Sequence, residues 1–151
     1  MSEHDPDEGG RTDALSSGAT ISNPATMFDP APLAFSQVAT VPAGARIVYV
    51  AGQVGGAKGG REKGSFKSQV RTAFENIDLA MQAAGGSIAD VVKLVVYIVR
   101  HDEGKHAVLI EEVRRAFGNR LAPTCTIVPL AQSGTDPNQL IEIEATGAIT
   151  A

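Results

Sequence analysis

One apolar run restricts the fold of this chain more than any other feature of the sequence. Residues Val91–Val99 read VVKLVVYIV, which is almost wholly apolar and rich in β-branched side chains. Such side chains favour strands, and an unbroken run of them favours a strand that is covered on both faces. No run in the chain approaches the length needed to cross a membrane. The chain is therefore predicted to fold around one central, covered β-strand.

Two segments with helical periodicity flank this strand. Residues 65–84 place apolar side chains on one face, and the glycine pair at 85–86 is expected to end that helix. A second helix is expected over residues 105–117, with Val108 or Leu109 among its inward-facing side chains. The inward stripe of the first helix comprises Val70, Ala73, Ile77, Ala80, Met81 and Ala84.

Four further segments have the composition of strands, at residues 35–41, 46–51, 124–130 and 140–149. Turn residues at 42–45 predict that the first two form a hairpin. The order ββαβαββ indicates an α+β fold, with one mixed sheet and two helices packed on one face. The other face keeps apolar positions, so we expect a second subunit to cover it.

The first 27 residues differ in composition from the rest. They are rich in Ser, Gly, Asp, Pro and Thr without an apolar period, which predicts a flexible acidic tail at 1–27 before a folded domain at 28–151. Residues 1–26 carry five acids and one base, which account for the whole net charge of −4. The neutral remainder is expected to give little long-range attraction for nucleic acid or an anionic membrane.

The single cysteine and the amino-terminal residues favour a cytoplasmic location for the protein. The single cysteine, Cys125, cannot form an internal disulfide, and the first residues lack the basic start and apolar stretch of a signal peptide. No local pattern supplies Cys125 with a histidine base. We therefore expect a buried or pocket-lining thiol rather than a nucleophile.

Other motifs give little support for a cofactor, a metal or RNA. The glycine-rich segment 54–64 matches neither GxxxxGK[ST] nor GxGxxG and is expected to be a mobile surface loop. His101 and His106 are five residues apart without a helix-phased carboxylate, so no metal site is predicted. The basic run at 58–71 is better explained as a solvated face than as an RNA contact.

Two acids on the last expected strand leave two interpretations open. Glu142 and Glu144 are two residues apart, so they share one face, while Ile141 and Ile143 face the other way. On a solvated face the acids are ordinary surface charges, which is what composition favours. At a subunit cleft, one carboxylate could orient water or accept a proton.

Several ordered motifs resemble those of one known family, across residues 28–151. They are FSQV at 35–38, VYVAGQV at 48–54, the long phrase RTAFENIDLAMQAAGGSIADVVKLVVYIV, PTCTIV in the next strand and IEIEA at 141–145. Together they resemble the Rid (reactive intermediate deaminase) family, also called YjgF-type. The resemblance implies a chorismate-mutase-like fold assembled as a homotrimeric barrel, with helices outside and pockets between subunits. Active members hydrolyse enamines and imines and release ammonia without a cofactor.

The resemblance also identifies a gap in the expected pocket. Active members grip the substrate carboxylate with an arginine, whose position falls here on Pro123 or, after a shift of one residue, on Thr124. A shift of one residue exchanges the faces of a strand, so either Thr124 or Cys125 could line the pocket. Arg120 could supply the missing guanidinium, and Arg100 is a weaker candidate.

The remaining pocket suggests two functions. The residues that match the family are Phe35, Ser36, Gly52, Gln53, Thr124, Cys125 and Glu142. In the first hypothesis, Glu142 orients the water that attacks an imine, and the products are a carbonyl compound and ammonia. In the alternative, a non-catalytic ligand-binding or chaperone-like trimer uses the same clefts.

Overall fold

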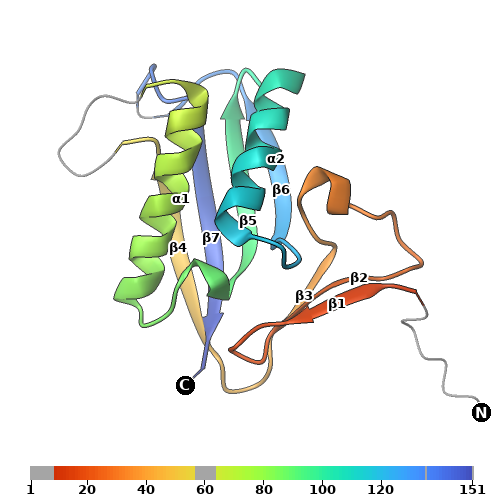
Figure 1. Cartoon of the computed structure of the whole chain (residues 1–151). Coiled ribbons are helices and arrows are strands. Elements are labelled where there is room, and N and C mark those ends of the chain that lie inside the picture. Colours follow the sequence, from red (N-terminus) through yellow and green to blue (C-terminus); the bar gives the residue numbers. More distant parts are fainter. Residues whose placement is uncertain (1–8, 57–63, 135, 151) are drawn as a thin grey trace, which may run out of the picture.

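A computed structural model describes residues 9–56, 64–134 and 136–150, which form two sheets and two α-helices (Figure 1). The α+β class is confirmed, as is the order ββαβαββ from β3 onward. The elements are β1 Arg11–Ala14, β2 Thr20–Asn23, η1 Ala31–Leu33, β3 Val38–Thr40, β4 Arg46–Val54, α1 Phe66–Ala83, η2 Ile88–Asp90, β5 Val91–Val99, α2 Glu103–Phe117, β6 Thr124–Leu130 and β7 Ile141–Ile149, where η marks a short 3₁₀ turn.

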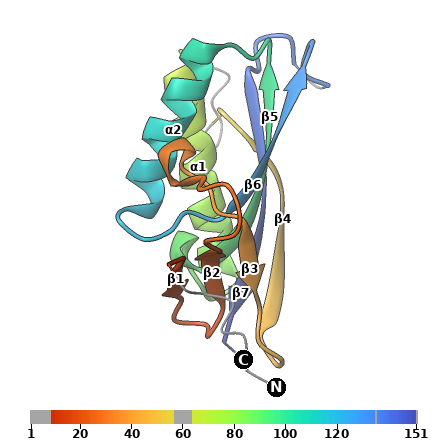
Figure 2. The ribbon, with the colours of Figure 1, turned by 90° about the vertical axis from the view of Figure 1, so that its right-hand side faces the viewer.

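The larger sheet has the strand order β4-β7-β5-β6, in which β5 and β6 are parallel and the other neighbours antiparallel. Both helices lie on one face, and Figure 2 shows the opposite face without a covering layer. In β5, Leu94, Val96 and Ile98 are buried in the core beneath the helices, whereas Lys93 is exposed. The predicted central strand is confirmed, but one of its faces is open in the single chain.

Both helices start at capping side chains. Ser65 accepts a hydrogen bond from the backbone N–H three residues later at 3.2 Å, and Asp102 does the same for α2 at 2.8 Å. Because of the Asp102 cap, α2 begins two residues earlier than predicted. Of the two inward candidates in α2, Leu109 is buried and Val108 is half-buried. In α1 the predicted stripe is buried at Val70, Ala73, Ile77 and Met81.

The predicted hairpin between residues 35–41 and 46–51 is wrong. β3 pairs with β2 in a separate sheet of order β1-β2-β3, and β4 pairs with β7. Just before β3 the chain approaches β6, where the Ser36 N–H donates to the Pro123 carbonyl at 3.2 Å. The turn at 42–45 therefore connects two sheets, because each strand finds its partner elsewhere in the chain.

β1 and β2 consist of residues that the sequence assigned to the flexible tail, so that prediction is wrong for 11–14 and 20–23. The cause is burial: Ile21 is fully buried in a small cluster with Leu121, and the Asp13 carboxylate accepts the Leu121 N–H at 2.5 Å. Residues 1–8 and 57–63, the latter in the predicted glycine-rich loop, lie outside the described part of the chain. The domain boundary at 27/28 stays a prediction.

Candidate functional site

The first group of predicted site residues, which we call the glutamate half-site, comprises Gly52, Gln53 and Glu142. Glu142 is half-buried on β7 and lies against Gly52 on the neighbouring strand β4. A Cβ atom at Gly52 would overlap the Glu142 carboxylate, so the close approach requires glycine. The pairing of β4 with β7 shifts register between Val50 and Gln53, as a bulge would cause. The Gln53 side chain donates to the Ala51 carbonyl at 3.0 Å and so turns back along its own strand.

The two acids of β7 have different surroundings. Ile141 and Ile143 are buried in the core, which confirms that Glu142 and Glu144 share the open face. The Tyr97 hydroxyl donates to Glu144 at 3.3 Å, and partial desolvation together with the Glu144 charge raises the pKa of Tyr97. Glu142 makes no hydrogen bond or ion pair with any residue that the structure describes. Of the two acids, Glu142 is thus the one whose carboxylate accepts no hydrogen bond from a described residue.

The second group, which we call the aromatic half-site, comprises Phe35, Ser36, Thr124 and Cys125. An isolated parallel bridge joins Ser36 to Thr124 and brings the segment before β3 against the start of β6. The Thr124 hydroxyl donates to the Val92 carbonyl at 3.0 Å, so it is used by the backbone of β5. The four residues line an open hollow of about 540 Å³.

Cys125 adjoins two hollows, and its side chain faces the helices. Its side chain packs with Ile127 against the main core, on the helix side of β6, whereas the neighbouring residue Thr126 is exposed. Together with His106 it also lines a second hollow of about 310 Å³ beneath η1 and α2. Burial raises the pKa of the Cys125 thiol to about 12, so the thiol is protonated at neutral pH. Its chemistry is therefore that of a small apolar wall residue.

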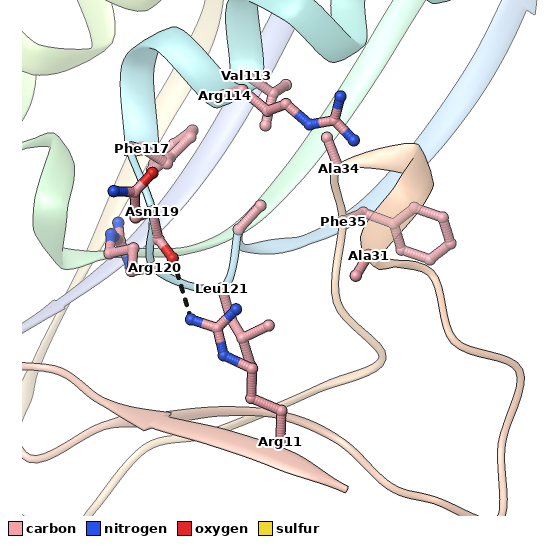
Figure 3. Close-up of a pocket in the computed structure, with 12 residues that line it drawn as sticks. Arg11, Ala31, Ala34, Phe35, Val113, Arg114, Phe117, Asn119, Arg120 and Leu121 are labelled. Atoms are coloured by element: carbon pink, nitrogen blue, oxygen red, sulfur yellow. Dashed lines mark hydrogen bonds between the residues drawn. The ribbon is translucent and has the colours of Figure 1, made fainter.

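Neither register places an arginine in the aromatic half-site, because the two candidate positions hold Pro123 and Thr124. Pro123 is buried, and its carbonyl accepts the Ser36 N–H. Arg120 donates to the Ile88 carbonyl at 3.3 Å, and its guanidinium lies over the Phe117 ring, 5.0 Å from the centroid. Burial lowers the pKa of Arg120. Figure 3 shows Arg120 beside Phe117 and Phe35 across a hollow of about 280 Å³ that both residues line. In the single chain Arg120 Nη2 is thus used by the Ile88 carbonyl, whereas the buried Nη1 has no hydrogen-bond partner among the described residues.

The two half-sites lie at different places on the larger sheet. The glutamate half-site is on β4 and β7, and the aromatic half-site is at the opposite edge, on β6. On the shared neighbour β5, Glu142 is opposite Tyr97 and Thr124 is opposite Lys93. Four residues of strand span roughly 13 Å, and two strand spacings add roughly 10 Å across the sheet. One small molecule cannot touch both half-sites of the same chain.

Lys93 lies at the aromatic half-site but was not among the predicted site residues. It is exposed on β5 and lines the open hollow of about 540 Å³ together with Ser36 and Thr124. It is the one charged residue in the apolar run VVKLVVYIV. A single charge in a strand expected to be covered on both faces was the sequence signal that could have identified it.

Within the described ranges, no cluster of three or more His, Cys, Asp or Glu side chains could hold a metal ion. His101 and His106 contact one another, with Nε2 and Nδ1 3.3 Å apart. The helices that the structure describes include none long and apolar enough to span a membrane.

Comparison with known proteins shows similarity over most of the chain. The sequence model of the family described as "Endoribonuclease L-PSP" matches residues 29–149. A RutC family protein of Pyrococcus horikoshii is 37% identical over 83 residues, which cover 55% of this chain and 62% of that protein. The match thus spans less than two thirds of the curated relative's length.

Solved structures share the fold. A protein of unknown function of the conserved Rid family, YyfB from Yersinia pestis, has a TM-score of 0.80 and 27% identity, covering 87% of this chain and 98% of its own. RidA from an Antarctic Psychrobacter has a TM-score of 0.62 and 29% identity, covering 78% of this chain and 95% of its own. The family match, the two helices on one sheet face and the ordered motifs agree, and the chain belongs to the Rid, or YjgF-type, family.

Proposed function

We propose that this Rid-family chain hydrolyses small reactive imines or enamines to a carbonyl compound and ammonia, without a cofactor. The proposed site lies in the clefts between the subunits of a homotrimer. The observation that carries the proposal is the separation of the two half-sites within one chain. Each half-site is incomplete alone, and the aromatic half-site of one copy could complete the glutamate half-site of the next.

The open face of the larger sheet is suited to such an assembly. Ile47 and Tyr49 on β4 alternate with the core-facing Val48 and Val50, and their exposed fractions are 42% and 82%. Large apolar side chains gathered on an open sheet face favour burial against another copy of the chain. Because Glu142 lies on the same face, packing of this face brings the carboxylate into a subunit boundary.

The chemistry assigned to Glu142 is general base and acid catalysis. Its carboxylate accepts a proton from water as the water oxygen forms a bond to the imine carbon, and the proton is then passed to the nitrogen. Glu142 then takes the hydroxyl proton of the resulting carbinolamine and delivers it to the amino nitrogen, and ammonia leaves as the carbon–nitrogen bond breaks and the carbonyl forms. An enamine first takes up a proton at carbon to become the imine. Phe35 and Cys125 would form apolar walls that limit access of bulk water.

A subunit-mixing assay tests both the reaction and the shared site. Ammonia release is measured with 2-iminobutyrate or 2-aminoacrylate generated in situ. We expect Glu142→Gln to lower the rate at least 100-fold, which is the usual scale for loss of a general base. Phe35→Asp should also be inactive, because it disrupts the aromatic half-site.

Co-refolded mixtures of these two variants should regain part of the wild-type rate, since some clefts then contain two intact half-sites. Lys67→Gln, on the helical side, is the control that should keep full activity. Wild-type rates in Glu142→Gln would remove Glu142 from the mechanism. Inactive mixtures of correctly sized oligomers would contradict a site shared between subunits.

A second candidate is a non-catalytic ligand-binding or chaperone-like trimer that uses the same clefts. The absence of an arginine at Pro123 or Thr124, the two positions that could correspond to the family's arginine, favours it, as does the contact of Arg120 with Ile88 and Phe117. Ligand-induced increases in Tm for a range of carbonyl compounds, without ammonia release from any imine, would support this candidate over the first.

The structure gives less support to RNA as a substrate, although the family description names an endoribonuclease. In the basic run, Lys67 pairs with Glu111 at 2.6 Å, and Arg71 pairs with Glu112 through two hydrogen bonds of 2.7 and 3.0 Å. Residues 58, 61 and 63 lie outside the described ranges. RNA binding whose affinity fell steeply with salt would restore this candidate.

A further inference from the structure

Three arginines from three parts of the chain line the hollow of about 280 Å³ beside the carboxyl end of α2 (Figure 3). Arg11 comes from β1, Arg114 from the last turn of α2, and Arg120 from the segment that follows the helix. The rest of the lining is mostly apolar and contains no acidic residue. We call this the arginine hollow. The family model matches residues 29–149, so Arg11 contributes from outside the matched part of the chain.

Arg11 is held at the edge of the arginine hollow, and its charge is offset. Its Nη2 donates to the Asn119 carbonyl at 3.0 Å, which is the dashed line in Figure 3. The same nitrogen is 2.9 Å from the Asp13 carboxylate. These contacts fix the position of the guanidinium. The excess positive charge of the hollow therefore has to come from the other two arginines.

Arg114 is fixed in place without losing its charge. Its Nη2 donates to the Pro32 carbonyl at 3.0 Å, which joins α2 to η1 across the hollow. A carbonyl is a neutral acceptor, so this bond orients the guanidinium and leaves a full positive charge. No carboxylate in the described part of the chain forms an ion pair with Arg114. This arginine is therefore positioned to meet an anion in the hollow.

Arg120 has a donor that the single chain does not use. Its Nη2 donates to the Ile88 carbonyl at 3.3 Å, whereas Nη1 is buried without a partner among the described residues. Burial lowers the pKa of Arg120, and the charges of Asp90 and Asp13 act in the opposite direction. A buried donor without an acceptor is uncommon, because its desolvation is then not offset. An anion in the hollow would offset both the unused donor and the desolvated charge.

The arginine hollow is distinct from the aromatic half-site. The two share the Phe35 side chain, but none of the three arginines lines the hollows of about 540 and 310 Å³ beside Cys125. The arginine hollow also lies beside α2, which covers the helical face of the larger sheet, and not on the open face. A ligand bound there would therefore occupy neither the proposed imine cleft nor the proposed subunit interface.

We propose that the arginine hollow binds the phosphate of a phosphomonoester whose organic part is small and apolar. A phosphate monoester carries nearly two negative charges at neutral pH and three acceptor oxygens, which suit guanidinium groups that arrive from three elements. A carboxylate is planar and carries one charge, so it matches this arrangement less well. Phe117, Val113 and Leu121 give the hollow apolar walls for the organic part. The proposal does not depend on the imine hydrolysis.

Calorimetric titration of the full chain at low salt tests the proposal with phenyl phosphate, inorganic phosphate and benzoate. Wild type should bind phenyl phosphate at least about tenfold more tightly than inorganic phosphate, because the ring adds apolar burial. Benzoate, which keeps the ring and replaces the phosphate, should also bind at least about tenfold more weakly. Arg114→Gln and Arg120→Gln should each weaken phenyl phosphate binding about tenfold, the usual scale for one charge-assisted hydrogen bond. Arg114→Lys should keep part of the affinity.

Arg115→Gln is the matched control. Arg115 is the next residue along α2 and is half exposed, but it lies near Glu112 and does not line the hollow. It removes the same charge from the same helix, so phenyl phosphate affinity should stay unchanged. Arg114 is exposed, so Arg114→Gln remains decisive even where Arg120→Gln disturbs the packing on Phe117.

Four results would overturn the proposal. No binding of phenyl phosphate to wild type at millimolar concentration would remove the site. Unchanged affinity in Arg114→Gln would place the ligand elsewhere, and an equal loss in Arg115→Gln would reduce the effect to the general charge of the surface. Benzoate binding as tight as that of phenyl phosphate would contradict the choice of phosphate over carboxylate.

Discussion

Cys125 shows how the fold sets the chemistry of one side chain, and this effect should appear in the pH dependence of stability. Burial raises the pKa of its thiol from 9.0 to about 12. Between these values the unfolded chain loses the proton while the folded chain keeps it. The free energy of unfolding should therefore fall as pH rises through this window, by up to about 1.4 kcal/mol per pH unit. Below pH 9 the thiol contributes no slope.

Urea denaturation of wild type and Cys125→Ala at intervals from pH 8 to about pH 10.5 measures this effect. Both proteins contain the same tyrosines and lysines, so the difference between their slopes isolates the thiol. Parallel slopes above pH 9 would show that Cys125 is more accessible than the structure indicates.

The residue types of the candidate site could be predicted from the sequence, but their grouping could not. Phe35 and Cys125 are 90 positions apart, and they meet because an isolated bridge joins Ser36 to Thr124. No local pattern encodes a single bridge between distant segments. Lys93 was overlooked for a related reason: a strand expected to be covered on both faces has no place for a charge, and the open face appears only once the helices are located.

Among the elements, prediction from the sequence succeeded where one pattern of apolar side chains extends over many residues. α1 and β5 have strong patterns, and their observed bounds differ from the predicted ones by no more than a residue. The hairpin failed because the turn at 42–45 is compatible with either a hairpin or a connection between sheets. The choice depends on strands distant in the sequence, since β3 pairs with β2 and β4 pairs with β7. β2 itself carries one large apolar residue, Ile21, which is too little to give a periodic signal.

The burial of Ile21 gives a direct test of the amino-terminal hairpin. Its side chain is fully buried against Leu121 and Ala148. We expect Ile21→Ala to lower the free energy of unfolding by about 2–4 kcal/mol, which is the usual cost of such a cavity in a core. Met27→Ala is the matched control, because Met27 is 48% exposed in the same segment and should change stability by less than about 0.5 kcal/mol. Equal, small effects of both variants in chemical denaturation would mean that residues 11–23 do not pack as described.

For the whole molecule, the larger sheet of the single chain has one face covered by helices and one open face. The helices cover the first, and the second combines Tyr49 and Val95 with Lys93, Glu142 and Glu144. A purely structural interface would not need unpaired charges there, because charges are costly to bury unless they find partners. The proposed cleft accounts for both features: apolar residues join the subunits, and the charges are placed where a ligand and a water molecule can meet them.

Tyr49 is the residue through which assembly and activity can be tested together. It is 82% exposed on the open face, and Leu79 is 63% exposed on α1, on the helical side. Tyr49→Glu would place an unpaired charge inside the proposed interface, whereas Leu79→Glu leaves its charge in water. Light scattering should show a trimer for wild type and Leu79→Glu, and mainly monomer for Tyr49→Glu. Ammonia release should disappear with the trimer, since a monomer keeps both half-sites too far apart for one substrate. A monomeric Tyr49→Glu that retained full activity would place the reaction within one chain and contradict the shared cleft.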